Sequence, residues 1–99
     1  MEKIEAIGIV EVLYYTTALD ILDHMLKSAD VKLVHKETAL GGKLVTIFVS
    51  GSISNVTASI EAAKEAVSEN RQDLLKNTVV ITNPHREILK YIVSKSQGE

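Results

Sequence analysis

The order of the apolar patterns along the chain constrains its fold more than any other feature of the sequence. Runs rich in β-branched residues predict strands, and segments with one apolar stripe at helical spacing predict helices. The predicted strands cover residues 4–15, 31–38, 43–50 and 77–82, and the predicted helices cover 16–30, 53–70 and a terminal segment that begins at residue 83. The first six of these elements match the split βαβ order of ferredoxin-like folds. We therefore predict an α+β fold, in which a ferredoxin-like four-stranded antiparallel sheet carries two helices on one face and a short C-terminal helix follows.

Local signals predict where two of the helices begin. Thr17, followed three residues later by Asp20, resembles a capping box with a shorter acid. Asn83 is the predicted N-cap of the last helix, and Pro84 then takes the first helical position, where its missing N–H costs nothing. Gly8, inside the first predicted strand, indicates a bulge or the close approach of another backbone.

Length and composition limit the classes of function. The 99 residues predict one domain over 1–99, with its core at about 4–92 and a short tail at 93–99. The formal net charge of −2 provides no basic surface for nucleic acid. No apolar run approaches the roughly 20 residues that span a bilayer, and the first residues lack the layout of a signal peptide. We expect a cytoplasmic protein that binds neither nucleic acid nor membrane.

The residue types that carry chemistry do not form a catalytic pattern. His24, His35 and His85 lack the spacing of metal ligands on one helix, and the chain has no cysteine to serve as a ligand or nucleophile. Asp20 and Asp23 belong to an ordinary charged helix face. Small-molecule pockets are often lined by aromatic residues, and this chain has only one Phe, three Tyr and no Trp. We expect no catalytic residue, no metal and no cofactor, and hence no enzyme.

Two adjacent glycines and a lysine, Gly41, Gly42 and Lys43, join the second predicted strand to the third. In a hairpin the glycines supply a positive φ, and the lysine begins the next strand. Phosphate binding would need the glycines to lead into a helix, whereas here they lead into a strand. From these residues alone, a hairpin turn is the simplest interpretation.

Four segments, taken together, carry a resemblance to a known family: AIGIVEV (6–12), ALDILDHMLKSADVKLV (18–34), GGKLVTIFVSGSISNVTASIEAA (41–63) and VVITNPHREILKYI (79–92). In this order they resemble the bacterial microcompartment shell proteins, in the single-domain, hexamer-forming class. The resemblance covers roughly residues 4 to 92 and implies the fold of the BMC (bacterial microcompartment) domain.

This resemblance implies a structural shell protein that forms homo-hexamers, tiles with other hexamers and carries a central pore for small polar metabolites. The residues that it assigns to the pore lining are Leu40, Gly41, Gly42 and Lys43, and those that it assigns to the edge between hexamers are Lys27, Asn83 and His85. The implied partners are other shell proteins and encapsulated enzymes, in the shell of a cytoplasmic microcompartment.

Two features depart from the family pattern, and other interpretations stay open. The chain has one more residue between VKLV and LVTI than common members, and Asn83 stands where the family often has Arg before its Pro-His pair. From the residues alone, Lys27 is a solvated lysine favoured by the C-terminal helix dipole. The alternative function is a ferredoxin-like regulatory domain that binds a small effector between subunits, because this fold hosts many functions. Two subunits rather than about six would favour that alternative.

Overall fold

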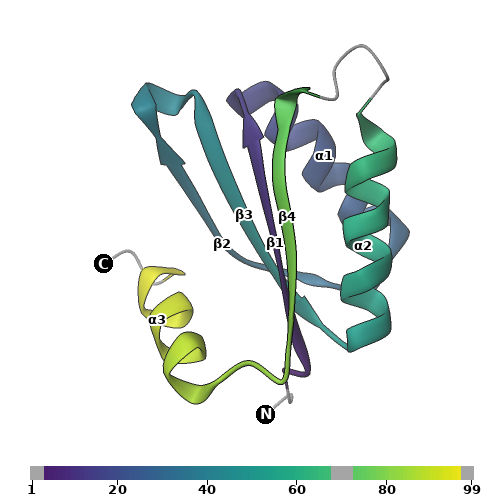
Figure 1. The fold of residues 1–99 in the computed structure, drawn as a ribbon, viewed down its shortest axis with the longest axis vertical. Helices are drawn as coiled ribbons and strands as arrows, with labels where there is room; N and C mark the ends of the chain where they lie inside the picture. Colours follow the sequence, from purple (N-terminus) through teal and green to yellow (C-terminus); the bar gives the residue numbers. More distant parts are fainter. Residues whose placement is uncertain (1–3, 68–72, 97–99) are drawn as a thin grey trace.

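The chain folds in the predicted order of strands and helices. The computed structural model describes residues 4–67 and 73–96, so the predicted end of the second helix at 68–70 lies outside the described residues. The elements are β1 (Ala6–Leu13), α1 (Tyr15–Ser28), β2 (Lys32–Ala39), the short 3₁₀ helix η1 (Leu40–Gly42), β3 (Leu44–Gly51), α2 (Ile53–Ala66), β4 (Leu75–Thr82) and α3 (Arg86–Ser96). Figure 1 shows their arrangement.

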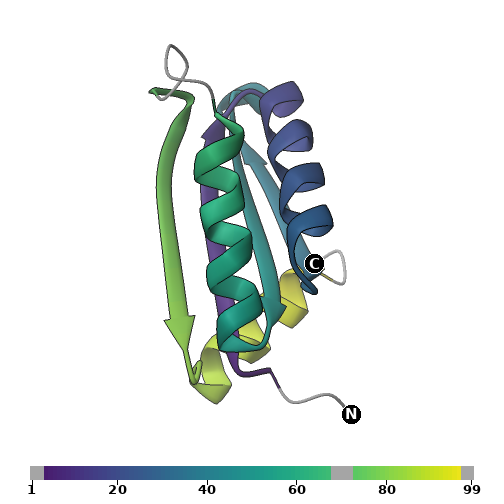
Figure 2. The same ribbon diagram turned by 90° about the vertical axis from the view of Figure 1, so that its right-hand side faces the viewer.

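The four strands form one antiparallel sheet in the order β2-β3-β1-β4. β1 pairs with β3 on one side and with β4 on the other, while β2 pairs with β3. Helices α1 and α2 lie together on one face of this sheet (Figure 2). The predicted α+β fold, with a four-stranded antiparallel sheet and two helices on one face, is confirmed.

The hydrophobic core lies between the sheet and these two helices. Side chains alternate between the two faces of a strand. Val10 and Val12 of β1 share one face with Ile47 of β3, which pairs with Val10, and all three are fully buried. They belong to one cluster with Met25 of α1 and Ile60 of α2. The apolar runs that predicted central strands therefore supply one wall of the core, and the helical stripes supply the other.

Gly8 lies on the core face of β1, opposite α2. A Cβ added here would lie 2.9 Å from Cγ1 of Val56 and 3.1 Å from Cγ2 of Val49. The neighbours are side chains and not the backbone that the sequence indicated. The predicted bulge is also wrong at this position, because the irregularity in the pairing of β1 with β4 falls between Glu11 and Val12. Gly8 allows close packing of the helix layer on the sheet.

Both predicted N-caps are wrong. Tyr14 precedes α1 without a side-chain cap, and Thr17 is a buried residue within the helix. α3 begins three residues after Asn83, and the carbonyl of His85 accepts a hydrogen bond from the N–H of Leu89 at 3.1 Å. Asn83 has a φ of 49°, a conformation that Asn tolerates better than most residues. It therefore turns the chain out of β4, and the proline after it lies before the helix.

Helix α3 lies on the face of the sheet opposite α1 and α2 (Figures 1 and 2) and packs against β2. Its residue Ile92 is buried, and so are Ile7 and Ser50, which pair with each other across β1 and β3 and share this face by strand alternation. The sequence predicted this helix but not the face that it covers. Within the described residues, no helix is long and apolar enough to span a membrane.

Candidate functional site

The loop of Leu40, Gly41, Gly42 and Lys43, here called the 40–43 loop, joins β2 to β3 at one end of the sheet (Figure 1). Three consecutive residues have a positive φ: 54° at Leu40, 66° at Gly41 and 89° at Gly42. Lys43 has right-handed helical angles, and its N–H donates to the carbonyl of Leu40 at 3.3 Å. The hairpin interpretation is confirmed, but Lys43 belongs to the turn rather than to the following strand.

The 40–43 loop projects into solvent. Leu40 is 71% exposed, and a Cβ added to Gly41 or Gly42 would meet no atom within 4 Å. Within one chain the glycines are therefore favoured by their backbone angles and not by a lack of space. Any crowding at this loop has to come from another molecule.

Tyr14 ties the 40–43 loop to the start of α1. Its N–H donates to the carbonyl of Lys43 at 2.7 Å. The pairing of Leu13 with Leu44 brings these two segments together. The sequence placed Tyr14 near the end of the first strand and missed its link to the loop. No local signal could have revealed it, because the contact depends on the register between β1 and β3.

The predicted edge residues lie at the opposite end of the sheet from the 40–43 loop. Lys27 is in the last turn of α1, which runs back from the loop end of the sheet. Asn83 and His85 follow β4, whose last residue pairs with the first residue of β1, and the N–H of Asn83 donates to the carbonyl of Glu5 at 2.8 Å. All three edge candidates are exposed. The chain is 40 Å along its longest axis, so the loop and the edge candidates are well separated.

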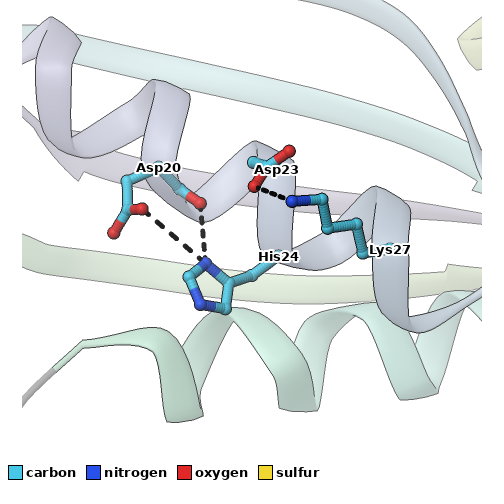
Figure 3. A network of polar contacts seen from close by, with 4 residues as sticks. All are labelled: Asp20, Asp23, His24 and Lys27. Carbon is cyan, nitrogen blue, oxygen red and sulfur yellow. Dashed lines mark hydrogen bonds and ion pairs between the residues drawn. The ribbon is translucent and has the colours of Figure 1, made fainter.

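Two polar pairs follow one another along α1 (Figure 3). The ammonium of Lys27 lies 2.9 Å from Oδ2 of Asp23, and the Lys27 side chain is 75% exposed. Nδ1 of His24 lies 2.9 Å from the carbonyl oxygen of Asp20 and 3.8 Å from its Oδ1. Exposed pairs of this kind contribute little to stability. Lys27 therefore has no strong structural role within its own chain.

The histidines do not come together. His24 is in α1, His35 is in β2 and His85 precedes α3. Nε2 of His35 lies 3.1 Å from Oε1 of Glu37, and its ring centroid is 5.7 Å from that of Phe48. In the part of the chain that the structure describes, no group of three or more His, Asp or Glu side chains is placed to hold a metal ion.

A hollow of about 280 Å³ lies near the first turn of α2, at the end of the sheet away from the 40–43 loop. The N–H of Ile53 donates to Oε1 of Glu5 at 3.3 Å, and the N–H of Asp30 donates to Oδ1 of Asn55 at 3.3 Å. Several polar groups at its wall thus already bond to one another. The sequence did not predict this hollow, because its lining comes from segments far apart in the chain.

Comparison with known proteins places this fold in a family. The model of the BMC domain matches residues 6–84. The chain belongs to the BMC domain family. The matched region includes the 40–43 loop, Lys27 and Asn83, and it ends just before His85.

Relatives of this BMC domain include two shell proteins that match it over most of their length. The carboxysome shell protein CcmK1 of Thermosynechococcus vestitus is 35% identical over 88 residues, which cover 89% of this chain and 76% of the relative. The bacterial microcompartment shell protein PduA of Citrobacter freundii is 36% identical over 88 residues, which cover 89% of this chain and 91% of the relative.

A solved structure of a microcompartment protein from Desulfitobacterium hafniense has the same fold, with a TM-score of 0.78 and 24% sequence identity. The match covers 93% of this chain and 48% of that chain. The BMC domain described here thus spans about half the length of the solved protein.

Proposed function

We propose that this BMC domain is a structural shell protein of a bacterial microcompartment and that the chain 1–99 acts as a single shell domain. It forms cyclic homo-hexamers, which tile with one another and with other shell proteins into a cytoplasmic shell that encloses enzymes. The pore of each hexamer passes small polar metabolites and is lined by Leu40, Gly41, Gly42 and Lys43. The edges between hexamers include Lys27, Asn83 and His85. The role is structural and not catalytic, and it needs no cofactor.

The observation that best supports the proposed pore is the open space around Gly41 and Gly42 within one chain. In a closed ring of head-to-tail contacts, a loop that faces the symmetry axis meets its own copies there. Residues without side chains allow several backbones to converge there, and positive φ favours glycine in any case.

The length of the molecule supports the assignment of the edge. When the 40–43 loop faces the axis, the other end of a 40 Å chain points outward. Lys27, Asn83 and His85 all lie at that outer end. An exposed lysine whose ion pair contributes little to its own fold is available for contact with a neighbouring hexamer.

Light scattering after gel filtration tests the assembly. We expect a mass of about six chains, because cyclic closure of head-to-tail contacts is required to form a pore. A mass of two chains would instead favour the regulatory domain that binds an effector between subunits.

Engineered cysteines test where the loop lies within that assembly. The sequence has no cysteine, so Gly42→Cys introduces the only thiol. We expect mild oxidation to link neighbouring chains through this position. Lys64→Cys is the control, on the exposed surface of α2. Crosslinking of the control but not of Gly42→Cys would place the loop on the perimeter and contradict the pore.

Lys27→Ala is expected to abolish flat sheets of hexamers in electron micrographs while leaving the hexamer intact. The thermal midpoint should change by less than about 4 °C, because an exposed pair contributes less than about 1 kcal/mol. The matched control is Lys64→Ala, which removes another exposed lysine from a helical ion pair, here with Glu61 at 3.2 Å. Loss of the hexamer in the Lys27 variant would give this residue a role within the ring instead of between rings.

A further inference from the structure

Tyr14 holds a backbone conformation that is unusual for a residue with a large side chain. Its φ is 71° and its ψ is 133°. The positive φ is disfavoured for L-residues, and the ψ lies outside the small left-handed helical region that they sometimes enter. Glycine alone adopts such angles without steric cost. Bulky residues persist in strained conformations where the surrounding structure fixes them, and such positions cluster at functional sites.

Two backbone hydrogen bonds fix this conformation. The N–H of Tyr14 donates to the carbonyl of Lys43 at 2.7 Å, and the carbonyl of Tyr14 accepts from the N–H of Ala18 at 3.0 Å. The first bond attaches Tyr14 to the 40–43 loop, and the second begins α1. These bonds need only a backbone, so they would form equally well with glycine at this position.

Packing of the Tyr14 side chain in the core does not offset the cost of this backbone conformation, because the residue is 50% exposed. Leu40, on the other side of the glycines, combines the same features, with a φ of 54° and 71% exposure. Two bulky, exposed side chains, one within the 40–43 loop and one bonded to it, therefore stand at positions where the backbone favours glycine. Neither the core nor the turn explains their size.

We propose that Tyr14 restricts passage through the pore and so helps to set its permeability. This inference rests on the proposed hexamer, in which each 40–43 loop lies at the axis and brings its bonded Tyr14 to the pore mouth. The phenol ring narrows the mouth, and its size limits the solutes that pass. The backbone strain is the consequence of placing a ring where glycine would fit best.

Tyr14→Gly and Tyr14→Ala, compared in the intact hexamer, test both parts of the inference. Both variants should conduct acetate several-fold better than the wild type through hexamers assembled into closed shells, because both remove the ring. Tyr14→Phe should conduct like the wild type, since it keeps the ring. Tyr91→Ala is the control, because it removes an exposed tyrosine of α3, away from the loop.

Thermal unfolding of the same variants reports the strain. Tyr14→Gly should melt higher than Tyr14→Ala by roughly 4–8 °C, because only glycine relieves the positive φ. Equal midpoints for the two variants would show that the backbone is not strained and would overturn that part of the inference.

The conduction and crosslinking results together test the role of Tyr14 separately from the existence of the pore. Unchanged conduction in both Tyr14→Gly and Tyr14→Ala, in a protein whose Gly42→Cys variant crosslinks, would overturn the role of Tyr14 and leave the pore in place. Absence of the Gly42→Cys crosslink would overturn the pore, and the role of Tyr14 with it.

Discussion

Gly8→Val is expected to lower the free energy of unfolding by about 3 kcal/mol or more, because overpacking of a tight core costs about 1–3 kcal/mol and occasionally exceeds this range. Even a single added carbon would lie 2.9 Å from Val56, 3.1 Å from Val49 and 3.3 Å from Ile60. Two of these side chains belong to α2 and the third belongs to β3. The valine side chain therefore has to push the helix away from the sheet.

Urea denaturation of Gly8→Val, Gly8→Ala and Ile9→Val measures this effect. The alanine variant should lose less stability than the valine variant, since it adds one carbon. Ile9 is the next residue of β1 and lies on the other face of the sheet, so Ile9→Val should cost at most about 1.5 kcal/mol. Wild-type stability in Gly8→Val would mean that α2 can shift freely, which the close contacts argue against.

Gly42→Leu is expected to block conduction through the hexamer while leaving the hexamer assembled. A Cβ at Gly42 meets nothing within its own chain, so folding of the chain is affected only by the φ of 89°. That conformation costs an L-residue about 1–2 kcal/mol. At the pore, however, the leucine side chains of all the copies would meet at one axis.

Gly42→Ala separates these two effects in the same measurement of acetate conduction. Alanine carries a similar backbone cost but adds only one carbon at the axis. We expect the leucine variant to pass almost no acetate, and the alanine variant to keep part of the wild-type conduction. Equal conduction in the two variants would show that residue 42 does not line the narrow part of the pore.

The sheet and its two covering helices could be predicted because their apolar patterns are local and strong. The runs around Val10 and Ile47 have the composition of strands, and the stripe that contains Met25 has helical spacing. The glycines of the 40–43 loop could be assigned to a turn for the same reason. Their proposed place at a pore was suggested by the family resemblance, and the open space around them in one chain supports it.

What the sequence could not predict depends on contacts between distant segments. The first helix was predicted at 16–30 with a capping box at Thr17 and Asp20, but Thr17 lies inside the helix, which follows Tyr14, a residue held by the carbonyl of Lys43. The N-cap predicted at Asn83 was wrong, because this residue turns the chain beside Glu5 and α3 begins three residues later. In both cases a long-range hydrogen bond outweighed a local preference.

The separation between the 40–43 loop and Lys27 has a consequence for engineering. Substitutions more than about 10 Å apart that share no partners have nearly additive effects. The loop and Lys27 lie at opposite ends of a 40 Å chain and join no common ion pair in the described residues. In the proposed shell, the solutes that pass through a hexamer and the contacts between hexamers can therefore vary independently. A shell built from such units could acquire a new permeability by exchange of a few loop residues, without any change to the contacts that hold its facets together.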